Sequence, residues 1–80
     1  MTTITFKEVA TGKTRIECFT SLDQIRKILV KSYYDVKDRA VYVKNGKKLE
    51  EIIGVSFDEH DEAKKLLQNF HVIPQDDDYN

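Results

Sequence analysis

The single cysteine, Cys18, limits what this chain can fold into, because one thiol cannot form a disulfide within an 80-residue chain. Secreted domains of this size usually depend on several disulfides. We therefore expect one hydrophobic core in a protein of a reducing compartment, the cytoplasm. A composition of 40% hydrophobic and 34% charged residues, with three Gly and one Pro, indicates a globular domain rather than a disordered chain.

The chain shows no pattern of a membrane or secreted protein. Its apolar runs, such as residues 28–30, are far shorter than a membrane span. Residues 1–3 have no basic segment followed by an apolar one, as a signal peptide would have. We expect a soluble protein.

The first twenty residues predict a β-hairpin. Polar and apolar residues alternate over 3–7, which places Ile4 and Phe6 on one face of a strand. A turn with Gly12 follows, and alternation resumes over 14–18 with Ile16 and Cys18 facing inward. In this interpretation Cys18 is a small buried hydrophobic residue.

Residues 22–34 predict an amphipathic helix. Ser21 followed by Gln24 is a capping-box pattern, and apolar residues then recur every three or four positions. Tyr33 and Tyr34 end this helix, with one ring facing solvent as a candidate interface anchor. A turn containing Asp35 and Asp38 ends the helix.

A second hairpin is predicted from residue 39 onwards. Residues 39–44 are rich in β-branched and aromatic residues and lead into Asn45-Gly46, the preferred pair of a type I′ turn. Residues 47–53 fit either a return strand or a short helix capped by Gly54. The strand is favoured, with Leu49, Glu51, Ile53 and Val55 on one face.

A second amphipathic helix is predicted to start at Ser56, where Glu59 completes another capping-box pattern, and to end near Phe70. Pro74 prevents its continuation, so we expect a single globular domain over 1–74 and a flexible acidic tail over 75–80. The predicted fold class is α+β: ββα-ββα order, with an antiparallel sheet of about four strands and both helices packed on one face.

Charge is divided along the sequence. Residues 1–49 hold eleven Lys or Arg and five Asp or Glu, whereas residues 50–80 hold two Lys and nine acids. The acidic half could bind a basic groove of a larger protein. Its candidate partner-binding residues are Glu50, Glu51, Asp58, Glu59, Asp61, Glu62, Asp76, Asp77 and Asp78. A solvated face with a solubilising tail is the simpler interpretation.

Basic and aromatic residues gather around the second hairpin, a combination that can hold phosphates and stack bases. The candidate nucleic-acid-binding residues are Lys37, Arg39, Lys44, Lys47, Lys48 and Tyr42. Lysines beside a hairpin turn also protect an exposed strand from aggregation, which is the simpler explanation.

The chain contains few residues that could carry out catalysis. One cysteine and two histidines are too few for an evident nucleophile and base, and no phosphate-binding loop or metal-binding motif occurs. His60 lies among four acids, but a helix places it with apolar residues on the buried side. We expect no enzyme activity, cofactor or metal.

These patterns lead to a functional hypothesis by elimination. We expect a small protein-binding module, an inhibitor or regulator of the kind that phages also encode, which occupies a surface of a larger protein through its acidic half. The alternative is a nucleic-acid-binding domain that uses the basic second hairpin. We expect a monomer or a weak homodimer that does not bind membranes.

Overall fold

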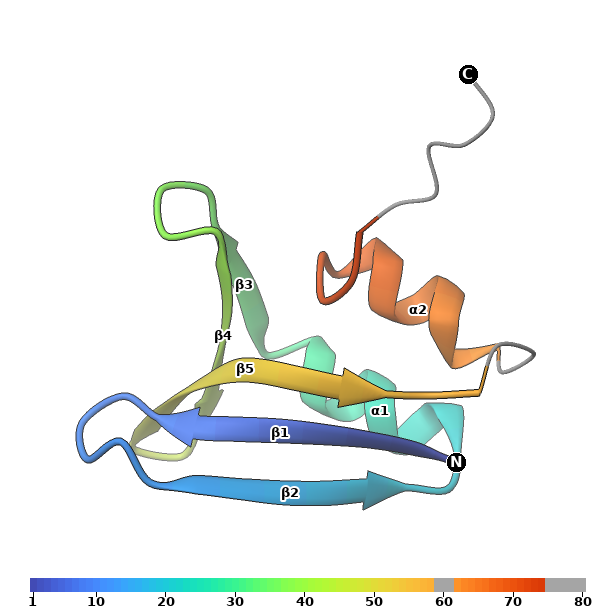
Figure 1. Ribbon diagram of the computed structural model, residues 1–80, viewed down its shortest axis with the longest axis horizontal. Helices are drawn as coiled ribbons and strands as arrows, with labels where there is room; N and C mark the ends of the chain where they lie inside the picture. Colours follow the sequence, from blue (N-terminus) through green and yellow to red (C-terminus); the bar gives the residue numbers. More distant parts are fainter. Residues whose placement is uncertain (59–61, 75–80) are drawn as a thin grey trace.

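The computed structural model describes residues 1–58 and 62–74, which form one antiparallel sheet with two helices (Figure 1). The strands are β1 (Thr2–Glu8), β2 (Thr14–Phe19), β3 (Ser32–Asp35), β4 (Ala40–Asn45) and β5 (Lys48–Ser56). Helix α1 (Leu22–Leu29) follows β2, and helix α2 (Ala63–Asn69) follows β5. The order across the sheet is β2-β1-β5-β4-β3, so β5 lies between the two hairpins that precede it.

The predicted ββα-ββα order with about four strands was wrong, because the described residues contain a fifth strand, β3. The predicted helix over 22–34 ends at Leu29, where the Ser32 hydroxyl donates a hydrogen bond to the Leu29 carbonyl. Tyr33 and Tyr34 then pair with Tyr42 and Val41 of β4. Pairing with β4 therefore places these aromatic residues in a strand, which they favour, rather than in the last turn of a helix.

The start of α1 follows the sequence prediction. Ser21 is extended, and its hydroxyl accepts a hydrogen bond from the Gln24 backbone N–H. The Gln24 side chain accepts a hydrogen bond from the Thr20 N–H. Two backbone donors at this helix start are thus satisfied by side chains.

The second helix is shorter than predicted, since Ser56 is the last residue of β5 and α2 begins at Ala63. Its end is a Schellman motif. The His71 N–H donates to the Gln68 carbonyl and the Val72 N–H to the Leu67 carbonyl. His71 occupies the left-handed position of this motif, with φ of 64°.

The core lies between one face of the sheet and both helices. Ile4 and Phe6 of β1 face inward, as predicted, and pack with Ile25 of α1 and Leu67 of α2. Phe19, Leu29, Val43 and Ala63 complete the buried cluster. In Figure 1, α1 lies behind β1 and β5, so the opposite face of these strands is turned toward the viewer.

The first hairpin forms as predicted, with φ of 79° at Gly12 in its turn, but the orientation predicted for β2 was wrong. Arg15, Glu17 and Phe19 pair with the inward-facing residues Phe6, Ile4 and Thr2 of β1. The side chains of Ile16 and Cys18 therefore face outward, and both are exposed. The interpretation of Cys18 as a buried hydrophobic residue is corrected accordingly.

The strand alternative for residues 47–53 was confirmed, because Lys47 lies in the turn after β4 and residues 48–53 belong to β5. Asn45 pairs with Lys48, so the turn residues are Gly46 and Lys47 rather than Asn45 and Gly46. Gly46 has φ of 64° and Lys47 is not in the left-handed region, which is the pattern of a type II′ turn.

A β-bulge in β5 reverses the predicted facing of its residues. Phe6 pairs with Ile52 and Thr5 pairs with Gly54, which leaves Ile53 as an extra residue. Before the bulge, Glu50 and Ile52 face the core. Leu49, Glu51 and Ile53 lie away from the core, whereas Val55 pairs with the inward-facing Ile4 and packs against the core. The single face predicted for these four residues was therefore wrong.

Candidate functional site

One face of the sheet is left uncovered by the described helices. With the exception of Ala40 at the start of β4, no residue on this face is buried, whereas the opposite positions hold the core. We call this surface the open face: Thr3, Thr5, Lys7, Thr14, Ile16, Cys18, Tyr33, Tyr42, Lys44, Leu49, Glu51, Ile53, Gly54 and Ser56.

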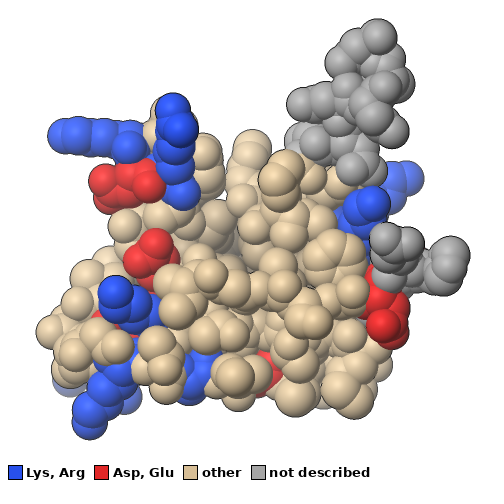
Figure 2. All heavy atoms as spheres, viewed as in Figure 1, with Lys and Arg blue, Asp and Glu red and all other residues tan. Residues whose placement is uncertain are grey.

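Large apolar and aromatic side chains lie on the open face. Ile16 is 69% exposed, Tyr33 is 50% exposed and the bulge residue Ile53 is 47% exposed. Figure 2 shows this side of the molecule: a broad area without charged side chains extends over the right-hand part of β1, β2 and β5, and the charges lie around it. This uncharged area joins the exposed Ile16 and Ile53 with threonine and serine side chains. An interface core poor in charged residues with a charged rim is typical of a protein-binding surface.

Tyr33 and Tyr42 form an aromatic pair at the β3 side of the open face. Their ring centroids are 5.6 Å apart, and the Tyr42 hydroxyl donates a hydrogen bond to the Asp38 carboxylate at 3.1 Å. Desolvation, followed by the hydrogen bond to Asp38, raises the pKa of Tyr42 above its ordinary value. The pair is therefore held in place beside acidic groups, with Glu51 next to Tyr42 across the strands.

The structure divides the predicted basic site between the two ends of β4. Lys37 and Arg39 lie at the β3–β4 turn, whereas Lys44, Lys47 and Lys48 lie at the β4–β5 turn. A strand of six residues separates the two groups by roughly 20 Å. Tyr42 lies between them, so the candidate nucleic-acid-binding residues form no single basic cluster.

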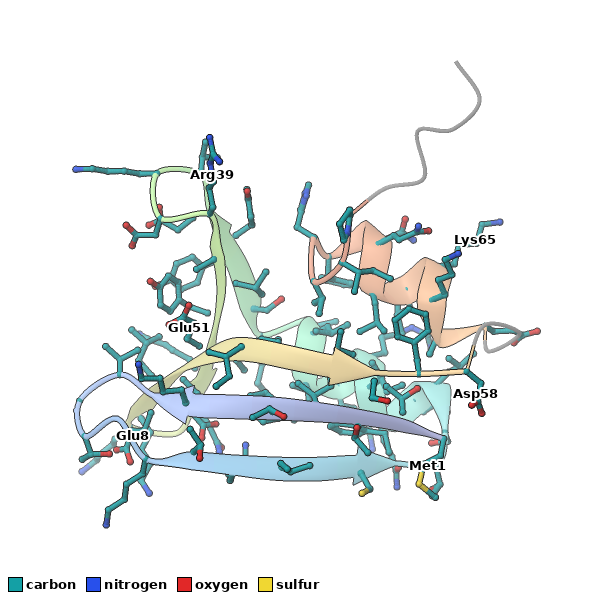
Figure 3. All side chains as sticks on the ribbon, viewed as in Figure 1. Met1, Glu8, Arg39, Glu51, Asp58 and Lys65 are labelled. Carbon is teal, nitrogen blue, oxygen red and sulfur yellow. The ribbon has the colours of Figure 1, made fainter. Side chains whose placement is uncertain are left out.

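The predicted acidic site is also dispersed. Glu50 faces the core side of β5 and is 4% exposed, while Glu51 lies on the open face between Lys7 and Tyr42. Figure 3 shows Glu51 and Asp58 far apart along the molecule. The predicted residues Glu59, Asp61, Asp76, Asp77 and Asp78, with His60 and the predicted tail, lie outside the described residues.

Glu50 is engaged by Arg15, a residue that sequence reasoning did not single out. The guanidinium makes two hydrogen bonds to the Glu50 carboxylate, at 2.9 and 2.8 Å, and one to Glu17 at 2.6 Å. It also lies over the Phe6 ring, 4.3 Å from the ring centre. The hydrogen bonds from Arg15 lower the pKa of Glu50, and those to Glu50 raise the pKa of Arg15.

Asp58 and Glu62 lie beside a pocket of about 400 Å³ at the start of α1. The amino group of Met1 lies 3.3 Å from an Asp58 carboxylate oxygen, and both groups are largely exposed. The pocket wall also includes Phe19, Leu22 and Ile25. An exposed ion pair of this kind contributes little to stability.

A second pocket, of about 310 Å³, lies between the β3–β4 turn and the segment that follows α2. Its lining joins aromatic, basic and apolar side chains, and we call it the Arg39 pocket: Tyr34, Arg39, His71, Val72, Ile73 and Pro74. The Tyr34 and His71 rings stack at 4.8 Å. Sequence reasoning placed Tyr34 in a helix and so could not bring it to His71.

No metal-site geometry is found in the part of the chain that the structure describes. Residues 1–58 and 62–74 contain no group of three or more His, Cys, Asp or Glu side chains that could hold a metal ion. Within the same ranges, no helix has the length and apolar character to cross a membrane.

Comparison with known proteins gives no further assignment. A scan against protein-family models found no matching family, and searches of curated proteins and of solved structures found no match.

Proposed function

We propose that this chain is a non-enzymatic protein-binding module, a regulator or inhibitor that covers a surface of a larger protein with its open face. The observation that supports this proposal is the exposure of Ile16, Tyr33 and Ile53 on a sheet face that the described helices leave uncovered. Burying these side chains against a partner would remove apolar surface from water, at roughly 25 cal/mol per Å². Tyr33 is also of a residue type enriched at interface hot spots.

The open face is a better candidate than the acidic half of the sequence. Glu50 is buried and bonded to Arg15, so its carboxylate cannot meet a partner without breaking that pair. Glu51, by contrast, lies on the open face beside Tyr42. We therefore assign acidic residues a role at the rim, where they would affect the rate of association more than the affinity.

Nucleic-acid binding is the second candidate, because the Tyr33–Tyr42 pair lies on the open face together with Lys44. Aromatic rings on a sheet can stack bases, and nearby lysines can hold phosphates. Asp38 and Glu51 lie beside Tyr42, however, and would repel a phosphate backbone. A protein partner has no phosphate backbone and is not repelled in this way.

We also propose a reducing compartment, the cytoplasm, as the place where the chain acts. Cys18 is exposed on β2, and an exposed thiol is readily oxidised outside such a compartment.

The proposal can be tested with two matched variants in a pull-down from a lysate of the native host, treated with nuclease. Ile16→Asp places a charge on the open face, whereas Val36→Asp makes the same kind of change in the β3–β4 turn, where Val36 is 77% exposed. We expect Ile16→Asp to reduce retention of a stoichiometric protein partner by about tenfold or more, equivalent to about 1.4 kcal/mol. Val36→Asp should retain it within about twofold.

Two outcomes would count against the protein-binding proposal. Equal retention by both variants would show that the open face is not the interface. Bound material that disappears with nuclease would favour nucleic acid, and Lys44→Glu should then abolish binding to an oligonucleotide with a marked dependence on salt.

A further inference from the structure

The Arg39 pocket lies away from the open face and has a chemistry of its own. In Figure 1 the β3–β4 hairpin stands up from the rest of the sheet and faces the segment after α2, and Figure 3 shows Arg39 at the free end of that hairpin. The pocket between them has a volume of about 310 Å³, near the lower end of the range for small-molecule sites.

Arg39 differs from the other two arginines. Arg15 is paired with Glu17 and Glu50, and Arg26 with Asp23. Arg39 makes no hydrogen bond or ion pair with any residue in 1–58 or 62–74. A guanidinium presents five N–H donors arranged to bind a carboxylate or a phosphate, so the unused donors at this rim suit an anion.

His71 adds a second nitrogen-bearing side chain to the same pocket. Its ring stacks on Tyr34, which fixes the orientation of the imidazole, and it makes no side-chain hydrogen bond within the described ranges. Val72, Ile73 and Pro74 supply an apolar wall beside these polar groups. The pocket can thus contact both an anionic group and an apolar or planar body attached to it.

The backbone conformation independently indicates that this pocket is a binding site. Among the described residues other than glycine, only Arg39 and His71 have positive φ, at 53° and 64°, and both line this pocket. Glycine would adopt either conformation at lower cost, and it is the usual residue at the position His71 occupies in a Schellman motif. Such backbone outliers cluster at binding sites. Here two residues with ligand-binding side chains stand where glycine would be the easier choice.

We propose that the Arg39 pocket binds a small ligand whose anionic group, a phosphate or a carboxylate, is held by Arg39 and His71. The apolar or planar part of the ligand packs on Val72, Ile73 and Pro74. This site is independent of the open face, and a ligand here could be bound together with a protein partner.

The test is a titration of the full chain, followed by amide chemical shifts, at constant ionic strength. The probes are sodium phosphate, adenosine 5′-monophosphate and an acetylated, amidated tri-aspartate peptide. We expect saturable shifts centred on Tyr34, Arg39 and residues 71–73, with a Kd in the millimolar range or below. Saturation by phosphate and the nucleotide identifies a phosphate site, and saturation by the peptide alone identifies a carboxylate site. Shifts that do not saturate with any probe, or that spread over all lysines and arginines, would overturn the proposal.

Matched variants separate the pocket from general charge. Arg39→Gln and His71→Gln should each weaken binding by about tenfold or more, because each removes a bond to a charged group. Lys37→Gln removes the same charge from the same hairpin outside the pocket lining and should weaken binding by less than about twofold. An equal loss in Lys37→Gln would mean that only the overall charge of the hairpin matters.

The variant Arg39→Gly distinguishes loss of the Arg39 side chain from misfolding of the chain. Because glycine relieves the strain at φ of 53°, this variant should unfold at a higher temperature than the natural chain and yet lose the anion. A more stable protein that still bound the anion at full affinity would overturn the role of the Arg39 side chain.

Discussion

At the scale of single residues, the most consequential contact is the one between Arg15 and Glu50. Both side chains face the core side of the sheet, yet they come from residues 35 positions apart, on β2 and β5. Removing one partner of such a pair leaves the other charge with unsatisfied hydrogen-bonding groups near the core, which costs more than the pair itself contributes. Arg15 is partly exposed, so water recovers part of that loss.

Glu50→Gln should therefore reduce both the stability and its dependence on pH. We expect the free energy of unfolding at pH 7 to fall by about 2 kcal/mol. Arg15 lowers the pKa of Glu50 in the folded chain below the ordinary value of 4.5, so the stabilisation is complete above pH 4.5 and is lost as the pH falls below it. Urea unfolding between pH 7 and pH 3 measures both effects.

Glu51→Gln is the matched control for this prediction. Glu51 is the next residue along β5 and lies on the open face, where it makes no hydrogen bond to Arg15. Its replacement should change stability by no more than about 0.5 kcal/mol. If the two variants lost stability alike, or if Glu50→Gln kept the acid dependence of the natural chain, the ion pair would not have the stabilising role given to it.

At the scale of secondary-structure elements, two serines with the same local pattern have different roles. Ser21 and Ser56 each precede Gln or Glu by three residues, and each was predicted to cap a helix. Only Ser21 does so, because Ser56 is held in β5 opposite Thr3. Local patterns could thus predict the start of α1 and the existence of the first hairpin, whose determinants are neighbours in sequence.

Elements that depend on distant partners could not be predicted in this way. The strand Ser32–Asp35 exists because β4 pairs with it, and its residues alone also fit the end of a helix. Arg15 and Glu50 face inward because they bind each other and because a bulge at Ile53 shifts the register of β5. Neither cause can be recognised in the sequence of one strand alone. For the same reason the open face and the Arg39 pocket were not foreseen, although several of their residues had been noted.

The two serines give a direct test of helix capping. Ser21→Ala should reduce the free energy of unfolding by about 1 kcal/mol, because the Gln24 N–H loses its acceptor. Ser56→Ala should change it by less than about 0.5 kcal/mol, since Ser56 is exposed at the end of a strand. Thermal and urea unfolding of the two variants would measure the difference, and equal losses would contradict the assignment of a single capping serine.

At the scale of the whole molecule, the fold mixes two halves of the sequence that carry opposite charge. Most of β5 comes from the acidic half, and this strand lies between β1 and β4 of the basic half. Arg15 binds Glu50 across this boundary, and the amino group of Met1 approaches Asp58. A sequence that is strongly dipolar along its length therefore folds so that Glu50 and Asp58 of its acidic half meet positive groups of its basic half.

This pairing of opposite charges within one fold predicts the oligomeric state of the chain in solution. If the two halves remained separate surfaces, copies would attract one another head to tail, and the attraction would weaken as salt screened it. Because opposite charges meet within one fold, we expect a monomer at both low and high salt. Sedimentation equilibrium over a range of protein concentrations at about 20 mM and about 500 mM salt, where the Debye length falls several-fold, is the measurement. A dimer at low salt that dissociates at high salt would show that unneutralised charge remains on the surface. A dimer that persists at both salt concentrations would indicate that copies associate through the open face instead.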